Sequence, residues 1–461
     1  MNNDSLELAI KALRDKVKSG KTLTFEWRIN QLNKINNLID KYKLEIIKAL
    51  YLDLGKSKIE ALSEILLIKQ EISLVKSKLR YWMKPKNINT PFYFYPSSSK
   101  VIYEPLGCVL ILAPYNYPFL YIFKPLVNIF SAGNTAIIKP SEKCKNTSKL
   151  IKRITGNYFE KNILFAVEGD YKVSEKLVKQ DLDHIFFTGS SKTGKSIMKL
   201  ASNNLTPLTL ELSGSNPVII LKNSNLKTAA KRIVWGKFFN SGQSCMAPNH
   251  IFAEKNIIND LIIEIKNAIF EFYGDKPLRS DDLSKLERKQ FDRTLELLKK
   301  YKNHKKIIFG GHHNKKLSKI SPTIIKIKAD NDPLIKNEIF SSLLPIMPIE
   351  SYKVAIDNIK KGSKPLAIYI FGGDSSIHKE ISNITSSGTI CINDVMLPVL
   401  IPNLPFGGVG LSGMGKFHGE EGFKTFSNQK SITKKSTLID INLRYPPYER
   451  IFKFIKIFLK V

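Results

Sequence analysis

The sequence has little cysteine: four residues in 461, with none spaced as CxxC. So few cysteines in a chain of this length exclude a disulfide framework, and reduced thiols are expected. The chain also lacks low-complexity tracts and internal repeats, and its composition is that of a globular protein. The first residues, MNNDS, lack the basic region and apolar core of a secretory leader. We therefore expect a cytoplasmic protein.

Acidic residues are also scarce: 41 Asp and Glu stand against 72 Lys and Arg, which gives a net charge of +31. Such an excess is ordinarily typical of proteins that bind nucleic acid or an anionic membrane. Here the lysines are spread along the whole chain with abundant Asn and Ile, and a drift toward AT-rich codons explains that pattern more simply. No nucleic-acid partner is expected. No metal site is expected either, because the pair His312-His313 has no carboxylate or cysteine at ligand spacing.

Helical patterns occupy the N-terminal part of the chain. Apolar residues recur at helical spacing from about residue 4 to residue 83, interrupted at Gly20 and Gly55. Residues 85–100 then contain the aromatic run 92–95 (FYFY) between prolines. This run is typical of an extended hairpin arm that makes a subunit contact, and a strand of the core is the alternative.

From Glu104 onward, short apolar runs rich in β-branched residues alternate with helical lengths. The runs are residues 108–112, 135–138, 163–167 and 185–187. This order predicts a parallel sheet with helices on both faces, and residues 251–400 predict a second α/β unit. Ligands bind beyond the carboxyl ends of such strands. The segments that follow the runs, at 113–118, 139–142 and 188–191, are therefore candidates for ligand contact.

Residues 189–196, GSSKTGKS, follow one of these strands and open a predicted helix. They match the GxxxxGK(S/T) phosphate loop, so a P-loop nucleotide triphosphatase is one hypothesis. Against it, the chain has no apolar strand that ends in the Asp needed to hold magnesium. The other hypothesis is a helix N-terminus that receives the pyrophosphate of a dinucleotide. Both predict phosphate contacts from Gly189, Ser190, Ser191, Lys192, Thr193 and Gly194.

Two residues are candidates for the chemistry itself. Glu211 lies in the apolar run 208–212, and such a setting raises the pKa of a carboxyl group toward that of a general base. A glutamate held by a salt bridge at a strand end is the alternative. Cys245 ends the segment 240–245, NSGQSC, whose small residues let a substrate approach closely. Its thiolate would be a nucleophile, and an inert buried thiol is the alternative.

The order of these residues resembles the motif order of the aldehyde dehydrogenases. The matching positions are Asn116, Lys139, Gly189, Glu211 and Cys245, followed by residues 338–340 (EIF), 392–394 (IND) and 404–415 (LPFGGVGLSGMG). The resemblance covers about residues 5–450. Residues 413–415 (GMG), 418–419 (HG) and 444–447 (RYPP) resemble the class 3 branch, which includes fatty and aromatic aldehyde dehydrogenases.

The resemblance implies a reaction, the oxidation of a medium-chain, long-chain or aromatic aldehyde to a carboxylic acid. It implies that Cys245 attacks the aldehyde carbon and that Asn116 and the Cys245 N–H hold the oxyanion. Glu211 would then activate the water that releases the acid from a thioester.

The resemblance also implies a nicotinamide coenzyme. Lys139 and Glu142 are expected at the adenosine ribose, Gly189 and Ser190 at the pyrophosphate, and Glu338 and Phe340 at the nicotinamide ribose. NAD is the expected coenzyme, because the charge of Glu142 would repel a 2′-phosphate, and NADP is the alternative.

The implied architecture is an aldehyde dehydrogenase-like α/β fold with a doubly wound Rossmann-like cofactor domain, a second α/β catalytic domain and a β-hairpin oligomerisation arm. A homodimer is expected. The predicted segments are a helical part of the cofactor-binding domain (1–83), the arm (84–103), the NAD(P)-binding domain (104–212), the catalytic domain (213–419), an oligomerisation segment (420–449) and a basic amphipathic tail (450–461).

Some positions depart from the family pattern. Tyr115 replaces a tryptophan and Ser213 replaces a glycine. Ser341-Ser342 replace Gly-Pro after Phe340, and this third change bears on cofactor affinity. The tail 450–461 places lysines on one helical face, and its twelve residues fall short of the roughly 20 needed to span a bilayer. We expect either weak peripheral contact with a membrane or packing on its own subunit.

Overall fold

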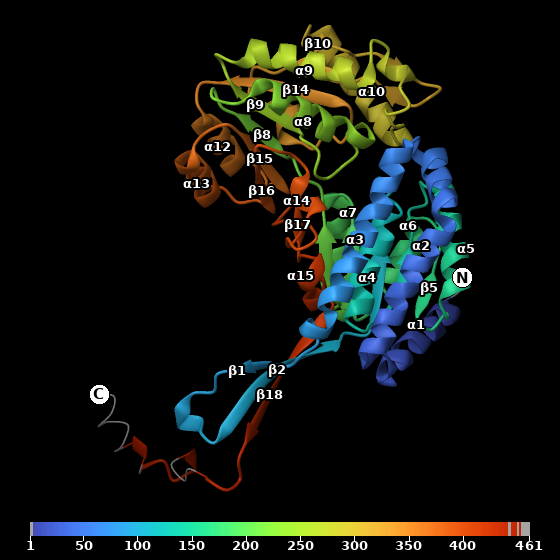
Figure 1. Cartoon of the computed structure of the whole chain (residues 1–461), viewed down its shortest axis with the longest axis vertical. Helices are drawn as coiled ribbons and strands as arrows, with labels where there is room; N and C mark the ends of the chain where they lie inside the picture. Colours follow the sequence, from blue (N-terminus) through green and yellow to red (C-terminus); the bar gives the residue numbers. More distant parts are fainter. Residues whose placement is uncertain (1–2, 441–443, 450, 453–461) are drawn as a thin grey trace.

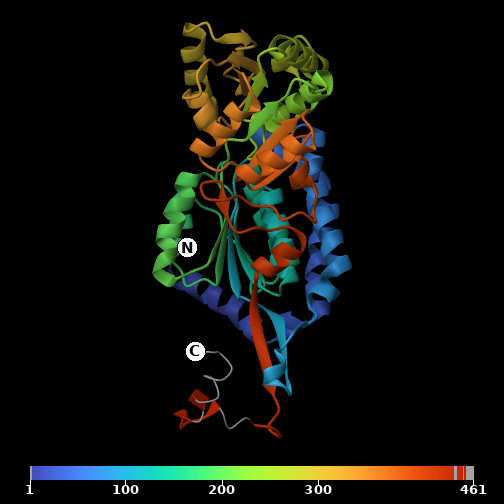
Figure 2. The same ribbon diagram turned by 90° about the vertical axis from the view of Figure 1, so that its left-hand side faces the viewer.

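The computed structural model describes residues 3–440, 444–449 and 451–452. Within these residues a six-stranded sheet, a seven-stranded sheet and a three-stranded sheet account for most strands. The first lies in the middle of the molecule, the second lies at one end, and the third projects as an arm at the other end (Figure 1, Figure 2). The predicted α/β architecture is confirmed.

The six-stranded sheet, called here the first sheet, has the order β17-β7-β6-β3-β4-β5. Its strands β3 to β7 are parallel, and β17 is antiparallel to β7. The strands are β3 (Cys108–Leu112), β4 (Thr135–Lys139), β5 (Leu164–Ala166), β6 (His184–Thr188), β7 (Leu208–Glu211) and β17 (Gly413–Met414).

Both faces of the first sheet are buried, because successive side chains of an apolar strand point to opposite sides. In β3, Leu110 packs in the core with α1, α6 and α7, while Val109 and Ile111 pack in the core with α4 and α5. Helices α2 and α3 form a further layer outside α4 and α5 (Figure 1). These helices are α1 (Asn3–Lys18), α2 (Phe25–Leu54), α3 (Lys58–Trp82), α4 (Leu120–Ser131), α5 (Lys145–Tyr158), α6 (Tyr171–Val178) and α7 (Ser191–Ala201).

The register of the first sheet aligns the carboxyl ends of its strands. Leu112 at the end of β3 is opposite both Lys139 in β4 and Phe187 in β6. Thr188 at the end of β6 is opposite Glu211 at the end of β7. The segments that follow these strands therefore meet at one edge, as the sequence predicts.

The seven-stranded sheet, called here the second sheet, has the order β10-β13-β14-β9-β8-β15-β16 and is parallel except for β10. Its strands are β8 (Pro217–Ile220), β9 (His250–Glu254), β10 (Ile307–Phe309), β13 (Thr323–Lys326), β14 (Leu343–Ile349), β15 (Ala367–Phe371) and β16 (Thr389–Ile392). The helices around it are α8 (Leu226–Phe238), α9 (Ile258–Tyr273), α10 (Arg288–Asn303), α11 (Pro333–Lys336), α12 (Tyr352–Lys361), α13 (Ser375–Ile384) and α14 (Leu397–Leu400), and a small hairpin joins β11 (His313–Asn314) to β12 (Lys319–Ile320).

The arm consists of β1 (Lys86–Ile88), β2 (Ser97–Pro105) and β18 (Ser427–Lys435), which follows α15 (Gly419–Thr425). Strand β2 pairs antiparallel with both others, which agrees with the predicted hairpin arm. The aromatic run at its tip is not extended, however: Phe92–Phe94 form a 3-10 turn. Pro91 and Pro96 lack the N–H donors that a strand ladder needs, which explains the turn. Phe92 is 88% exposed, so the alternative of a core strand is wrong.

The domain boundaries proposed from the sequence stay a prediction. Residue 450 and most of the predicted tail, 453–461, lie outside the described residues. In the part of the chain that the structure describes, no helix combines the length and apolar character needed to cross a membrane.

Candidate active site

A cavity of about 700 Å³ opens at the carboxyl edge of the first sheet. It brings together segments that are far apart in the sequence, including all three predicted catalytic residues. The predicted residues that line it are Asn116, Lys139, Glu142, Gly189, Ser190, Lys192, Thr193, Glu211, Cys245, Glu338 and Phe340. Ser191 and Gly194 do not line it. The Ser191 hydroxyl contacts the Ser213 hydroxyl at 3.0 Å, and Gly194 packs on Leu212.

Cys245 lies in a tight loop that connects α8 to β9. The loop begins with the 3-10 turn Phe239–Gly242, in which Asn240 (φ 51°), Ser241 (φ 54°) and Gly242 (φ 79°) are all left-handed. At Gly242 a side chain would collide with the backbone of Ser341, so glycine is required there. The loop is anchored to the second sheet, because the Asn216 amide donates to the Cys245 carbonyl at 2.6 Å.

The Cys245 thiol is 9% exposed and contacts the hydroxyl of Tyr121 at 3.5 Å. Burial and, to a smaller extent, the charges of Glu211 and Glu338 raise the pKa of the thiol, the hydrogen bond from Tyr121 lowers it, and the net result is a pKa of about 12. The thiol is therefore held neutral, and deprotonation needs a base or added positive charge.

Asn116 follows β3 and reaches the same loop. Its side-chain Nδ2 donates to the Gln243 backbone carbonyl at 3.0 Å, while the Asn116 backbone carbonyl accepts from Asn240 Nδ2 at 2.9 Å. The amide has a second N–H, and the residue lines the cavity beside Cys245. This placement suits the Asn116 amide to donate a hydrogen bond to the oxygen of a substrate whose carbon is bonded to the Cys245 sulfur.

Glu211 ends β7 and is buried. Within the described residues both of its carboxylate oxygens lack a hydrogen-bond partner. Burial raises the pKa of this carboxyl well above its ordinary value, opposed by the charge of Lys416. A carboxyl group with a raised pKa and free oxygens at a cavity is suited to take a proton from water. The alternative of a strand-end salt bridge does not hold, since no ion pair includes Glu211 among the described residues.

The opposite part of the cavity contains a helix N-terminus and an ion pair. Helix α7 points its N-terminus into it, and the Ser190 hydroxyl caps that helix by accepting from Thr193 N–H at 3.2 Å. A side chain at Gly189 would collide with the ring of Phe187, so the backbone there stays open to a ligand. The Lys139 ammonium contacts the Glu142 carboxylate at 3.1 Å. These groups fit a dinucleotide, with the pyrophosphate on exposed helix N–H groups and the charged pair at a ribose.

The chain matches the family model for the aldehyde dehydrogenase family over residues 1–432. The chain belongs to this family. It is 40% identical to the 4,4'-diaponeurosporen-aldehyde dehydrogenase of Staphylococcus aureus, an alignment that covers 95% of this chain and 96% of that one. It is 37% identical to the aldehyde dehydrogenase family 3 member H1 of Arabidopsis thaliana, with 95% and 91% covered. The solved substrate-bound state of Staphylococcus aureus AldH superposes with a TM-score of 0.94 at 38% identity, covering 98% of this chain and 99% of that one.

As an aldehyde dehydrogenase, the protein oxidises aldehydes to carboxylic acids and uses NAD or NADP. The structure also explains why the phosphate-loop pattern misleads. Only Gly189 and Ser190 lie between β6 and α7, and Lys195 is already within the helix. A phosphate loop needs the intervening residues to wrap a phosphate chain before the helix begins, so the triphosphatase hypothesis has no support.

In this aldehyde dehydrogenase the unusual serines pack against the cysteine loop. The Ser342 hydroxyl donates to the Ser241 carbonyl at 3.2 Å. Phe340 adopts φ 54° and its ring lies 6.2 Å from that of Tyr115. Glu338 accepts from the Gly214 N–H at 3.3 Å, and burial raises the pKa of Glu338 to about 8. Ser341-Ser342 thus form part of the support of the loop that bears Cys245.

Sequence reasoning missed two side chains of this dehydrogenase site. Tyr121, on the first turn of α4, contacts the Cys245 thiol, and Arg293 of α10 donates to the Glu338 carbonyl at 2.8 Å. Tyr121 lies only five residues after Asn116, beyond the end of β3, and the carboxyl-end rule extended by one helical turn would have included it. No comparable position after a strand pointed to Arg293.

Proposed function

We propose that Cys245 is the nucleophile of aldehyde oxidation in this chain, with Asn116 as the oxyanion donor and Glu211 as the general base. The observation that carries the proposal is that these three residues, from three separate segments, line one cavity. The buried, partnerless carboxylate of Glu211 has its pKa raised well above the ordinary value by burial, which makes it a stronger base than a carboxylate in water.

The proposed reaction consists of attack by sulfur, loss of hydride and hydrolysis. The Cys245 thiol gives its proton to water in the cavity, and the thiolate sulfur bonds to the aldehyde carbon while the carbonyl electrons move to the oxygen, which the Asn116 amide and the Cys245 N–H stabilise. Loss of hydride from this carbon restores the carbonyl as a thioester; Glu338 and Phe340, which line the cavity, would hold a nicotinamide ring that would supply the hydride acceptor. Glu211 then takes a proton from water, the hydroxide adds to the thioester carbon, and the carbon–sulfur bond breaks to release the acid.

For the coenzyme we propose a preference for NAD. Glu142 lines the cavity next to Lys139, and its negative charge opposes a 2′-phosphate on the adenosine ribose. Replacing Glu142 with Gln should raise kcat/KM for NADP relative to NAD. An unchanged ratio would contradict this assignment.

For the substrate we propose apolar aldehydes, of medium or long chain or aromatic. Tyr115 and Phe340 line the cavity with their ring centroids 6.2 Å apart, and the Tyr121 hydroxyl contacts the thiol. Aromatic walls favour apolar side chains over charged ones. The name of the Staphylococcus relative, 4,4'-diaponeurosporen-aldehyde dehydrogenase, agrees with such a class.

We also propose that the protein is a homodimer joined through the arm, and that the C-terminal tail makes weak peripheral membrane contact. Strand β18 ends the arm sheet, and edge strands bind further chains readily. Light scattering should find a dimer for the parent and a monomer for a variant that lacks residues 86–100.

The membrane contact has its own test. Unchanged liposome co-sedimentation after deletion of residues 450–461 would contradict it.

The decisive experiment follows formation of reduced nicotinamide with a panel of aliphatic, aromatic and charged aldehydes. Cys245→Ala should abolish turnover, while Cys108→Ala, which changes a thiol in the core near α1, should retain it. Turnover by a folded Cys245→Ala protein would refute the proposed nucleophile.

A further inference from the structure

Helix α3 carries two buried carboxylates one helical turn apart. Glu60 is 4% exposed and Glu64 is fully buried. A carboxylate removed from water is tolerated only where hydrogen bonds and opposite charge replace its hydration. Some of the groups that replace it here belong to the segments that hold Asn116 and Cys245.

Glu64 binds the segment that follows Asn116. Its Oε2 accepts from the backbone N–H groups of Phe119 at 3.1 Å and Leu120 at 2.9 Å, where α4 begins. Its Oε1 forms an ion pair with Lys56, and both side chains are inaccessible to solvent. The Lys56 ammonium lies 4.1 Å from the ring centre of Tyr117, the residue next to Asn116.

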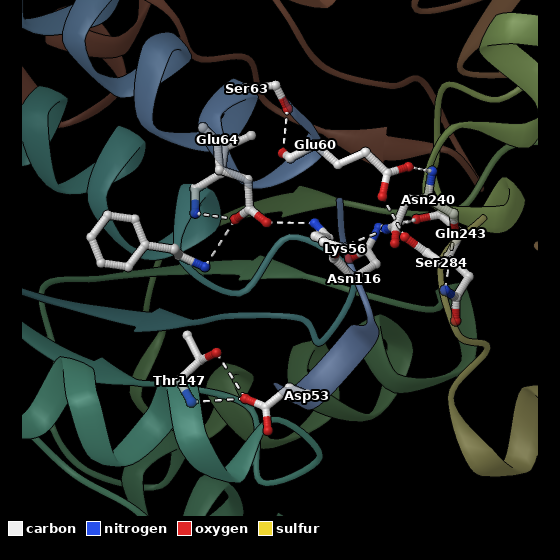
Figure 3. A network of polar contacts seen from close by, with 12 residues as sticks. Asp53, Lys56, Glu60, Ser63, Glu64, Asn116, Thr147, Asn240, Gln243 and Ser284 are labelled. Carbon is white, nitrogen blue, oxygen red and sulfur yellow. Dashed lines mark hydrogen bonds and ion pairs between the residues drawn. The ribbon is translucent and has the colours of Figure 1, made fainter. Parts of the chain in front are cut away.

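Glu60 binds the loop that leads to Cys245. Its Oε1 accepts from the Asn240 backbone N–H at 2.5 Å, and its Oε2 accepts from the Ser284 hydroxyl (Figure 3). The same Oε2 also accepts from the Ser57 N–H. Asn240 and Ser241 are both left-handed, a conformation that costs energy for residues other than glycine and persists only where contacts hold it. The bond from Glu60 is one of those contacts.

The two loops then meet. Asn240 Nδ2 donates to the Asn116 carbonyl at 2.9 Å, and Asn116 Nδ2 donates to the Gln243 carbonyl at 3.0 Å (Figure 3). Because Glu60 and Glu64 belong to one rigid helix, the distance between the loops is set from α3.

We propose that Glu60 and Glu64 are positioning residues of the reaction, which hold the Asn116 amide in place relative to Cys245. The inference rests on the roles proposed above for Asn116 and Cys245. Neither glutamate lines the cavity, so both act through the loops and without contact to substrate.

The helix supplies its own control in Glu71. This carboxylate is also fully buried in α3 and accepts from Asn128 Nδ2 and from the Gly419 N–H, each at 2.7 Å. It therefore resembles Glu60 in being buried and in accepting one bond from a side chain and another from a backbone N–H, but its partners belong to α4 and to the start of α15 and not to the cysteine loop. General damage to α3 should appear in Glu71→Ala, whereas loss of positioning should appear in Glu60→Ala alone.

The test compares three variants, Glu60→Ala, Glu60→Gln and Glu71→Ala. Each is measured by thermal unfolding and by kcat and KM for NAD and aldehyde. The rate at which iodoacetamide alkylates Cys245 is also measured, by mass spectrometry of the peptide that contains it. Glu60→Ala should lower kcat by about tenfold or more, since a misplaced catalytic group costs that much, with little change in KM for NAD. Glu60→Gln keeps an oxygen for the Asn240 N–H and should recover part of kcat. Glu71→Ala should lower the unfolding temperature while kcat and the alkylation rate stay at the parent level.

A milder pair keeps the test decisive if Glu60→Ala does not fold. Ser284→Ala removes a donor to the Glu60 carboxylate, whereas Ser63→Ala removes a hydroxyl that donates only to the Glu60 backbone carbonyl at 2.7 Å. A fall in kcat confined to Ser284→Ala supports the proposal. Equal kcat in both, or equal losses in Glu60→Ala and Glu71→Ala, would overturn it. Cys245→Ser is assayed alongside: if it is inactive while Glu60 behaves like Glu71, only this inference fails, and if it is active, the proposed function fails first.

Discussion

The side-chain amide of Asn116 donates a 3.0 Å hydrogen bond to the carbonyl of Gln243, two residues before Cys245. One N–H of the amide is thereby committed to the loop of the proposed nucleophile, and the other is free to face an oxygen on the substrate carbon. The bond fixes the amide before substrate arrives, which is the condition for strong electrostatic stabilisation of a developing charge.

Replacing Asn116 with Ala should therefore lower kcat by about 10²- to 10³-fold, the range for loss of one oxyanion donor. Steady-state kinetics of the folded variant measure this effect. Asn204→Ala is a suitable control, because Asn204 Nδ2 donates to the Lys179 and Gln180 carbonyls at the surface, each at 3.0 Å. A similar loss in both variants would mean that the Asn116 effect is structural.

Tyr121 should make Cys245 more acidic. Its hydroxyl is 3.5 Å from the sulfur, and this hydrogen bond lowers the pKa of the thiol against the effect of burial. A hydrogen bond to a charged group contributes about 1.5–3 kcal/mol, so Tyr121→Phe should move the pH dependence of Cys245 alkylation upward by about one unit or more. Tyr42→Phe, which alters a hydroxyl beside Asn157, should leave the profile in place. A downward movement in Tyr121→Phe would show that the hydroxyl does not stabilise the thiolate.

The positions of Asn116, Lys139, Gly189 and Glu211 could be predicted from the sequence because each follows or ends an apolar strand. Parallel pairing brings such positions to one edge whatever the loops between them do. The register confirms this: Leu112 is opposite Lys139, and Thr188 is opposite Glu211. The shared edge therefore follows from a local pattern.

Glu60 and Glu64 could not be found in this way. They lie in an amphipathic helix whose other charged residues are mostly at the surface, so nothing in the local pattern separates a buried glutamate from a solvated one. Their role depends on partners 180 residues away in the case of Glu60 and Asn240. The 3-10 turn at residues 92–94 was missed for a different reason, because alternation of aromatic residues outweighed the effect of the flanking prolines.

The buried His184 should make the protein less stable in acid. Burial lowers the pKa of His184 to about 4, and its Nε2 contacts the Thr209 hydroxyl at 2.9 Å. The unfolded chain takes up the proton near pH 6.5 and the folded chain does not, so stability present above that pH is lost as pH falls toward 4. His184→Gln should therefore lose about 2 kcal/mol less stability than the parent between pH 7 and pH 5. Denaturant unfolding at both pH values measures the difference, and equal losses would contradict the assigned pKa shift.

Glu211 should separate the two halves of the reaction. As a base it acts only when deprotonated, and burial raises the pKa of its carboxyl well above the ordinary value, so kcat should fall as pH decreases through that raised pKa.

Glu211→Gln removes the base but not the thiol or the Asn116 amide, so the thioester should form and then persist. Rapid mixing with NAD and aldehyde should give one burst of reduced nicotinamide per site followed by little turnover, and intact-mass analysis should find the acyl group on Cys245. Loss of the burst itself would mean that Glu211 is also needed to deprotonate the buried thiol, which has a pKa of about 12 in the free protein. Alkylation of Cys245 in Glu211→Gln distinguishes these cases, because removing a base for the thiol would slow alkylation, whereas removing a base for water alone would keep its rate at or above the parent level, since the charge of Glu211 raises the pKa of the thiol.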